Sequence, residues 1–238
     1  MRTAVVWRVL RGFLDDRAEA TGRTVFDIVD AGGGTGGFAV PLAEAGHNVT
    51  VVDPSPDSLA ALERRAAEAG VTVHATQGDA ADLLDVVPRG GADLVLCHNV
   101  LEYVDDPAPA LAAAGRAAAP DGAVSVIAAN TVAAVLHRAL SGRFDDALRL
   151  LGDPAGTWGE RDLMPRRFTA ERLTELIEKT GLRVREVHGV RVLADLVPSP
   201  LLDGDPSAFD ALVDLEARAS TIPALRDIAT QLHILATR

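Results

Sequence analysis

Short β-rich runs alternate with longer, alanine-rich stretches between residues 25 and 129. The short runs, of which residues 92–98 are the clearest, are almost continuously apolar, as in parallel strands whose two faces are both covered by helices. The longer stretches repeat their apolar residues at helical spacing. The alternation therefore predicts βαβ units that build one parallel sheet.

Individual elements can be assigned from these periods and from the turn residues between them. Strands are expected at residues 26–30, 48–53, 71–76, 92–98, 123–129, 182–192 and 231–237. Helices are expected at residues 38–45, 55–69, 108–118, 132–140, 144–151, 168–181 and 206–219. Ser55 and Thr169 are suitable N-caps, Gly70 is a suitable helix end, and residues 120–122 are expected to form a turn.

The alternation of strand-like and helix-like segments is interrupted after residue 130. Two amphipathic helical segments lead there into residues 152–159, a stretch that contains glycine and proline. We expect residues 131–167 to form a helical insertion or lid after the fifth strand. The predicted fold is a single α/β domain over residues 1–238, Rossmann-like, with a mostly parallel seven-stranded sheet and helices on both faces.

Composition fits one globular domain. The chain has 238 residues, of which 48% are hydrophobic and 24% charged. No apolar run approaches the roughly 18 residues that span a bilayer, and the N-terminal segment meets charged residues too early for a signal peptide. We therefore expect a cytoplasmic protein without a membrane segment.

Charge and the rarer residue types narrow the possible functions. The net charge of -11 argues against broad, nonspecific nucleic-acid binding, although it leaves room for a local basic face. Cys97 is the only cysteine and lies in an apolar run, so we expect a buried thiol and no intrachain disulfide. His137, His188 and His233 have no ligand spacing, and no metal site is expected.

A glycine-rich turn follows the first predicted strand and opens the first predicted helix. Its sequence is Asp30-Ala31-Gly32-Gly33-Gly34-Thr35-Gly36. Glycine is required where a ligand approaches the backbone closely, because a Cβ would occupy the space of the ligand. Taken alone, the turn is equally compatible with a nucleotide-type ligand and with a tight connection between strand and helix.

Polar residues at the ends of the later strands favour a nucleotide-type ligand over a merely tight connection. Asp53 closes the second predicted strand about 20 residues after the glycines, where a carboxylate can accept hydrogen bonds from both hydroxyls of a ribose. Asp30 would attract a cationic end of a ligand and repel a dinucleotide phosphate. Residues 78–80 follow the third strand and residues 98–99 end the fourth, at the edge where open α/β sheets bind ligands.

Over residues 25–130 this combination resembles the class I S-adenosylmethionine-dependent methyltransferases, whose first loop has the form Asp-x-Gly-x-Gly-x-Gly. The resemblance implies an enzyme with S-adenosylmethionine as its cofactor, and it implies that Asp79 lies beside the adenine amino group. The implied cofactor-binding residues are Arg2, Asp30, Gly32, Gly34, Asp53, Pro54, Gly78, Asp79, Ala80, His98 and Asn99.

Further motifs extend the resemblance, over nearly the whole chain, to the bacterial tRNA 5-carboxymethoxyuridine methyltransferases. These motifs are His98-Asn99-Val100-Leu101-Glu102-Tyr103-Val104 with Asp106-Pro107, Gly142-Arg143-Phe144-Asp145, Gly189-Val190-Arg191-Val192, Asp214-Leu215-Glu216-Ala217-Arg218 and His233-Ile234-Leu235-Ala236-Thr237-Arg238. That family converts a wobble uridine with a carboxymethoxy group to its methyl ester, so tRNA is the implied partner. Arg2, ahead of the first strand, is the implied contact to the cofactor's carboxylate.

The acceptor decides which side chains the reaction needs. Methyl transfer from a sulfonium is an in-line displacement, so its main requirement is alignment of the acceptor oxygen. A carboxylate acceptor is already anionic near neutral pH and needs an arginine clamp instead of a base. Arg191 is the first candidate, followed by Arg143, Arg166 and Arg167, although each is also compatible with a solvated surface charge.

Three other hypotheses stay open. A hydroxyl or amine acceptor on a small-molecule metabolite would need a base, for which His98 is the candidate, and the insertion would then close over an apolar pocket. A non-catalytic cofactor-binding protein would have no reason to keep the glycine turn together with Asp30 and Asp53. A NAD-dependent dehydrogenase would bind NADH in preference to S-adenosylhomocysteine.

Overall fold

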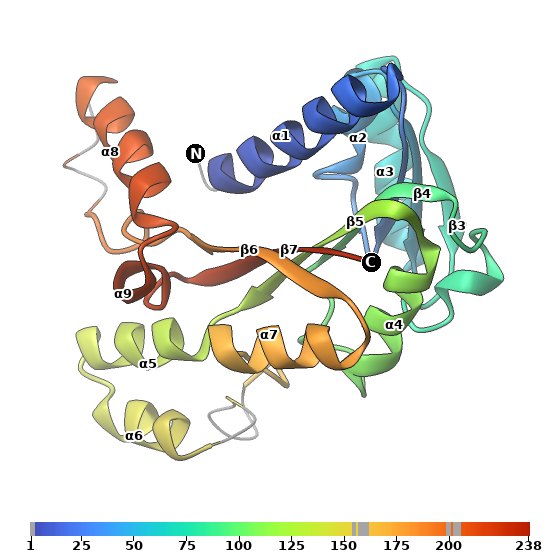
Figure 1. Cartoon of the computed structure of the whole chain (residues 1–238). Coiled ribbons are helices and arrows are strands. Elements are labelled where there is room, and N and C mark those ends of the chain that lie inside the picture. Colours follow the sequence, from blue (N-terminus) through green and yellow to red (C-terminus); the bar gives the residue numbers. More distant parts are fainter. Residues whose placement is uncertain (1–2, 154–155, 157–161, 199–200, 202–205) are drawn as a thin grey trace.

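A computed structural model describes residues 3–153, 156, 162–198, 201 and 206–238 of the chain (Figure 1). They form a seven-stranded sheet in the order β3-β2-β1-β4-β5-β7-β6. The strands are β1 (Asp27–Ala31), β2 (Asn48–Asp53), β3 (His74–Gln77), β4 (Ala92–His98), β5 (Ala118–Ala129), β6 (Arg183–Val190) and β7 (Gln231–Thr237). Strand pairs from β3 to β5 are parallel, whereas β7 is antiparallel to β5 and β6. The predicted, mostly parallel sheet is confirmed.

Helices cover both faces of this sheet (Figure 1). α1, α2 and α3 pack on one face, and α4 and α7 pack on the other. The helices are α1 (Ala4–Thr21), α2 (Ala39–Glu44), α3 (Pro56–Ala69), α4 (Pro107–Ala117), α5 (Thr131–Leu140), α6 (Phe144–Gly152), α7 (Ala170–Lys179), α8 (Pro206–Ala219) and α9 (Pro223–Arg226), with a 3-10 turn at Leu83–Asp85. Within the described part of the chain, no helix is long and apolar enough to cross a membrane.

Alternating side chains of the strands form two separate cores. In β4, Leu94 and Leu96 join the core under α1, α2 and α3, while Val95 and Cys97 join the core with α4 and α7. Every residue of β4 is buried, which explains the continuous apolar run in its sequence. Cys97 is the buried thiol that the sequence predicts, and burial raises its pKa to about 12.

The start of β5 differs from its prediction. β5 begins at Ala118, which pairs with Ala92, and the next pair along the ladder joins Ala123 to Leu94. Residues 120–122 therefore bulge out of a strand, and the predicted turn between a helix and residue 123 is wrong. A turn-forming sequence does not distinguish these two cases, because both leave the backbone exposed and irregular.

Two other strand ends differ by two residues or more. β3 begins later than predicted because Val71 still donates its amide to Ala66 in the C-terminal cap of α3. β6 ends earlier because Arg191 has a φ of 59°, a left-handed conformation that breaks the strand. In both cases the local geometry of one residue, which the apolar pattern does not report, sets the boundary.

α1 precedes the first strand and was not delimited from the sequence. Its buried residues, Val5, Val6, Val9, Leu10 and Leu14, recur at helical spacing and join the core under α1, α2 and α3. Gly22 ends the helix with a φ of 70°, and its amide donates to Ala18. The apolar side chains of α1 thereby cover the central strands.

The two helices predicted after the fifth strand are present as α5 and α6. Asn130 caps α5, because its side chain accepts a hydrogen bond from the amide of Val132. α6 packs against α5 and lies away from the sheet in Figure 1. Part of the predicted lid, residues 154–155 and 157–161, lies outside the described residues.

Candidate cofactor and acceptor site

A cleft of about 640 Å³ opens at the carboxyl ends of β1 to β4. It is lined by Gly32, Asp53, Pro54, Asp79, Ala80, Ala81, Asp82, Asn99, Val100, Tyr103, Val104, Asp105, Asp106 and Pro109. Six of the predicted cofactor-binding residues belong to this lining: Gly32, Asp53, Pro54, Asp79, Ala80 and Asn99. They follow four different strands, and the parallel sheet brings them together because all four strands end at one edge.

Asp53 joins the end of β2 to the glycine loop. One carboxylate oxygen accepts a hydrogen bond from the amide of Gly34 at 2.9 Å, and the other accepts from the amide of Ser55 at 2.9 Å. The backbone of Asp53 also accepts from the amide of Gly78 at 3.2 Å. A carboxylate has about four acceptor positions, so Asp53 retains the capacity to accept from ligand hydroxyls on the cleft side.

The loop after β1 needs glycine at two positions for different reasons. Gly32 has a φ of 74°, and a Cβ there would lie 2.3 Å from Cγ2 of Val100. Gly34 has a φ of 55°, and a Cβ there would have only the carboxylate of Asp53 within 4 Å. A side chain at residue 34 would therefore project into the open space above Asp53, which is the space a ligand would use.

Asp30 lies directly beneath this loop and is almost fully buried. A Cβ on Gly33 would lie 2.7 Å from the Asp30 carboxyl group, so the loop and the carboxyl are in close contact. Burial, and secondarily the nearby charge of Asp53, raises the pKa of Asp30 to about 7. A cationic group that arrives with a ligand would favour the ionised form.

The electrostatic character of the cleft is acidic. Among the described residues, its lining contains the carboxylates of Asp53, Asp79, Asp82, Asp105 and Asp106 and no lysine or arginine. The position of Asp79 is fixed locally, because its Oδ1 accepts from the amide of Ala81 at 2.8 Å. A cleft of this charge suits a ligand with cationic groups and is unfavourable for a dinucleotide with two phosphates.

Asn99 marks the rim of the cleft at the end of β4. It has a φ of 56°, and its amide donates to the carbonyl of Ile127 at 2.8 Å. Its side-chain oxygen accepts from the side-chain amide of Gln231 at the start of β7. Asparagine adopts this left-handed conformation more readily than other non-glycine residues, and the two hydrogen bonds fix Asn99 in it.

A row of polar side chains begins at His98 and crosses the α1 face of the sheet. His98 Nε2 lies 2.8 Å from Ser125 Oγ, which lies 2.9 Å from His233 Nε2. His233 Nδ1 lies 3.4 Å from His188 Nδ1, and His188 Nε2 lies 3.3 Å from a carboxylate oxygen of Glu186. β4, β5, β7 and β6 each contribute to this histidine row, which runs from His98 to Glu186.

These contacts argue against His98 as a general base. Burial lowers its pKa to about 3, so the neutral imidazole is a weak base at physiological pH. Its Nε2 is already bonded to Ser125, and the ring of Phe38 stands edge-on with the two ring centroids 4.5 Å apart. His98 also lies outside the residues that line the cleft.

The predicted arginine clamp residues lie in three different places. Arg166 donates to the carbonyls of Leu101, Val104 and Asp105, so it supports the cleft loop from behind. Arg143 is the N-cap residue before α6 and pairs with Asp146 in that helix. Arg167 is buried and pairs with Asp162. Arg2 lies outside the described residues.

Arg191 lies on the same sheet edge as Asn99. Its Nη1 is 3.2 Å from Asp195, and its carbonyl accepts from the amide of Thr230. The next residue, Gln231, reaches Asn99. Arg191 is therefore connected to the cleft rim through Thr230 and Gln231, whereas Arg166 contacts the cleft loop directly.

Tyr103 and Gln231 are two of the residues at this site that the individual predictions missed. Tyr103 lines the cleft and is 58% exposed, and the side chain of Gln231 in β7 donates to Asn99. Tyr103 belongs to a sequence motif that pointed to this region, so its exposed aromatic ring was a usable signal. Gln231 lies far from Asn99 in the sequence, and only the antiparallel insertion of β7 brings the two together.

A sheet of this order, a glycine loop after β1 and an acid at the end of β2 define a Rossmann-like protein that binds a nucleoside-type ligand. The family described as "Methyltransferase domain" matches residues 29–124, which extend from β1 into β5. The chain is 32% identical to a ubiquinone biosynthesis O-methyltransferase of Azorhizobium caulinodans, over 76% of this chain and 71% of the relative. It is 28% identical to the tRNA 5-carboxymethoxyuridine methyltransferase of Escherichia coli, over 100% of this chain and 88% of the relative.

Solved structures agree with the fold. An S-adenosylmethionine-dependent methyltransferase from Mesorhizobium loti superposes with a TM-score of 0.64 at 20% identity, over 98% of both chains. Magnesium protoporphyrin IX methyltransferase from Synechocystis with bound SAH superposes with a TM-score of 0.60 at 15% identity, over 100% of this chain and 85% of the other. The chain belongs to the S-adenosylmethionine-dependent methyltransferases. It is an enzyme of that class, with S-adenosylmethionine as its cofactor.

Proposed function

We propose that this enzyme methylates the carboxylate of a 5-carboxymethoxyuridine at the wobble position of tRNA and forms the methyl ester. The observation that carries the proposal is the extent of the likeness to the Escherichia coli tRNA enzyme, which covers the whole chain. The match therefore includes α5 to α9, which lie beyond the residues 29–124 that methyltransferases of many kinds share. Elements outside the cofactor-binding core are the part of such a fold in which acceptors are distinguished.

The cleft residues suit the parts of S-adenosylmethionine. Asp53 would accept from the ribose hydroxyls, Asp79 would accept from the adenine amino group, and Asp30 would attract the ammonium group. The open space at Gly34 and the acidic lining fit a ligand that carries a sulfonium and an ammonium. Bound S-adenosylmethionine supplies a methyl group on a positively charged sulfur, which an in-line acceptor oxygen can attack.

A carboxylate acceptor would need a cationic partner beside the acidic cleft. Such an acceptor is ionised before it binds, so the enzyme needs to align it and exclude water. Arg191 would hold it through its planar guanidinium, sharing that group with Asp195. The Nε of Arg191 is buried and has no hydrogen-bond partner among the described residues. Its N–H can therefore donate to the carboxylate of the substrate. α5, whose His137 lies 3.5 Å from Thr230 Oγ1, would form the fixed part of the lid.

A second candidate is a hydroxyl acceptor on a small molecule. It is favoured by the likeness to ubiquinone biosynthesis O-methyltransferases at 32% identity. That reaction must release a proton, which requires a base near the acceptor oxygen. The two candidates therefore differ in the chemical nature of their product, a methyl ester in one case and a methyl ether in the other.

The stability of the product in alkali separates these candidates. The enzyme is incubated with S-adenosylmethionine labelled in its methyl group and with tRNA that carries unesterified 5-carboxymethoxyuridine. We expect label in tRNA and its complete release as volatile methanol in mild alkali, because an ester hydrolyses and an ether does not. Label that enters tRNA but resists alkali, or that enters only a metabolite extract, would overturn the proposal.

An inactive control verifies that the label comes from this site. Asp53→Asn keeps the size of the side chain but removes the carboxylate that joins Gly34 and Ser55. We expect transfer to fall at least a hundredfold. Normal transfer by Asp53→Asn would mean that the cofactor binds elsewhere.

A further inference from the structure

The histidine row has one arrangement of hydrogens that satisfies all of its contacts when the imidazoles are neutral. The carboxylate of Glu186 can only accept, so His188 carries its hydrogen on Nε2 and has a bare Nδ1. His233 must then donate from Nδ1 to His188. Its Nε2 is consequently bare and accepts from the hydroxyl of Ser125. The order of donors is thus imposed from the Glu186 end of the row.

The same logic fixes the hydrogen of His98. The oxygen of Ser125 has given its hydrogen to His233, so it accepts from Nε2 of His98. His98 is left with a bare Nδ1. This atom is buried and makes no hydrogen bond with any described residue. A buried acceptor without a partner is costly, and it indicates a donor that arrives with a ligand.

His98 and Asp30 are diagonal neighbours on one face of the sheet, near the start of the glycine loop. Asp30 pairs with Leu96 in the parallel ladder of β1 and β4. His98 is the next β4 residue on the same face, because side chains alternate along a strand. Two buried acceptors, the carboxyl of Asp30 and Nδ1 of His98, therefore flank the point where the loop leaves β1.

We propose that the histidine row holds His98 as the Nε2–H tautomer, so that its Nδ1 accepts a hydrogen bond from the ammonium group of bound S-adenosylmethionine. An ammonium group carries three donors, so Asp30 and His98 can both accept from it. The neighbouring carboxyl favours a cationic donor over a neutral hydroxyl. Ser125, His233, His188 and Glu186 are positioning residues, since they act on the cofactor only through His98.

Two compounds derived from the cofactor test whether His98 contacts the ammonium group or another part of the ligand. S-adenosylhomocysteine carries the ammonium group, whereas 5′-methylthioadenosine has the same nucleoside and thioether but no ammonium group. ¹⁵N NMR of the histidine rings reports which nitrogen of each ring carries hydrogen and whether the other accepts a hydrogen bond. In the free enzyme we expect His98 with Nε2–H and a bare Nδ1. S-adenosylhomocysteine should shift the Nδ1 resonance upfield, and 5′-methylthioadenosine should leave it in place.

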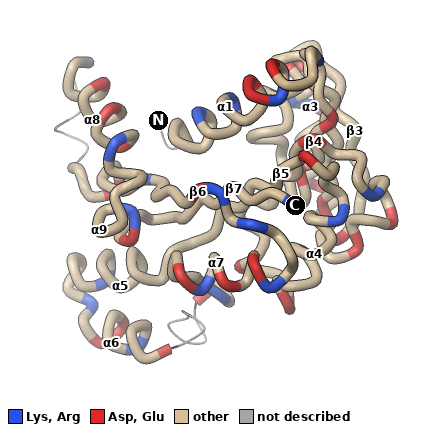
Figure 2. The backbone as a smooth tube through the Cα atoms, in the orientation of Figure 1, with Lys and Arg blue, Asp and Glu red and all other residues tan. Residues whose placement is uncertain are grey.

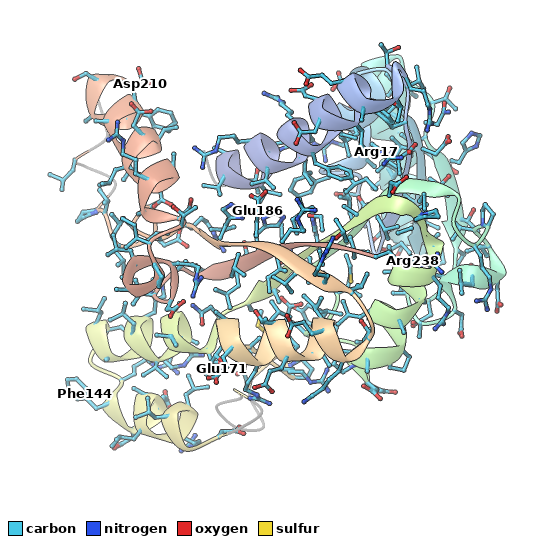
Figure 3. All side chains as sticks on the ribbon, viewed as in Figure 1. Arg17, Phe144, Glu171, Glu186, Asp210 and Arg238 are labelled. Atoms are coloured by element: carbon cyan, nitrogen blue, oxygen red, sulfur yellow. The ribbon has the colours of Figure 1, made fainter. Side chains whose placement is uncertain are left out.

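A remote variant tests whether the row imposes the tautomer. Glu186 is half exposed on β6 and is labelled in Figure 3. Glu186→Gln introduces an amide that can donate as well as accept, so both tautomers of the row become possible. We expect a mixture of tautomers at His98 and three- to tenfold weaker binding of S-adenosylhomocysteine. The matched control is Glu178→Gln, which neutralises an exposed carboxylate on α7 and should change neither.

Each contrary outcome has a defined meaning. Hydrogen on Nδ1 of His98 in the free enzyme overturns the tautomer assignment. An equal shift with both ligands, or with neither, overturns the contact to the ammonium group. A single tautomer at His98 in Glu186→Gln overturns control by the row. These measurements contain no methyl-accepting substrate, so their result is independent of whether tRNA is the substrate.

Discussion

A single buried carboxyl group, Asp30, connects cofactor binding to pH. Its pKa of about 7 means that it is neutral in acid and ionised in mild alkali when the cofactor is absent. We expect the affinity for S-adenosylhomocysteine to rise about tenfold between pH 5.5 and 7.5, as the carboxylate forms and attracts the ammonium group. Calorimetric titration across this range measures the effect. Asp30→Asn should bind more weakly and lose the dependence, whereas an unchanged slope in that variant would assign it to another group.

The same carboxyl group should make the free enzyme less stable as pH rises. The folded chain holds a proton on Asp30 up to about pH 7, whereas the unfolded chain releases it near pH 4. The folded state therefore binds more protons in this window, and the contribution of Asp30 to stability falls as pH rises through it. Urea unfolding at pH 5 and pH 7.5 tests this sign. Asp30→Asn should reduce the difference between the two values.

Gly32 is the position of the loop that tolerates a side chain least. Gly32→Ala would place a methyl group 2.3 Å from Val100 and would keep a φ of 74°. We expect the free energy of unfolding to fall by about 2–4 kcal/mol, from the clash together with the left-handed strain, and cofactor binding to be lost. Adding Val100→Ala removes the clash but not the strain, so it should restore about half of the stability. Full stability in Gly32→Ala alone would contradict the geometry.

At the scale of elements, Arg166 connects the segment before α7 to the loop between β4 and α4. It donates to three carbonyls of residues 101–105, two of which belong to residues that line the cleft. Arg166→Ala should free this loop and raise KM for S-adenosylmethionine about tenfold, with a smaller effect on kcat. Arg143→Ala is the matched control, because the exposed pair with Asp146 contributes little. Equal KM values in the two variants would exclude the supporting role of Arg166.

The sequence predicts elements well where burial is continuous and poorly where single residues set the ends. β2, β4 and β7 have the predicted bounds because each is a buried apolar run that ends at a polar residue or a turn. The start of β5 could not be predicted, since nothing in its sequence separates a bulge from a turn. Among the site residues, Gly32, Asp53 and Asp79 were predictable because each follows its own strand. The contact of Gln231 with Asn99 depends on the place of β7 in the sheet and leaves no local signal.

At the scale of the whole molecule, charge is distributed unevenly. The cleft at the carboxyl ends of the strands is acidic, whereas a groove of about 770 Å³ between α1 and the strands β5, β6 and β7 carries arginines. These are Arg8, Arg17, Arg183, Arg185 and Arg238, with Asp16, Asp121 and Glu186 among the other lining residues. Figure 2 shows basic residues on α1 and along β6, and Figure 3 labels Arg17, Glu186 and Arg238. A bulge places Arg185 next to Glu186 opposite Leu235.

If tRNA is the substrate, as proposed, this groove is the basic surface that we expect to bind it despite the net charge of -11. The side chains of Arg183 and Arg185 make no hydrogen bond or ion pair within the described part of the chain. Arg183→Gln with Arg185→Gln should raise KM for tRNA about tenfold, leave kcat unchanged and flatten the dependence of binding on salt. The control, Arg64→Gln with Arg172→Gln, removes the same charge from α3 and α7. An equal effect of both pairs would indicate net charge alone.

The position of β7 also governs how the protein can be made. Among the described strands, β7 is the only neighbour of β6, and β7 also pairs with β5. A nascent chain therefore holds β6 without a hydrogen-bonding partner until residues 231–237 have left the ribosome. Translation that stops earlier leaves two open strand edges, which favour aggregation. Premature termination should consequently give a product for proteolysis and not a shortened, partly active enzyme.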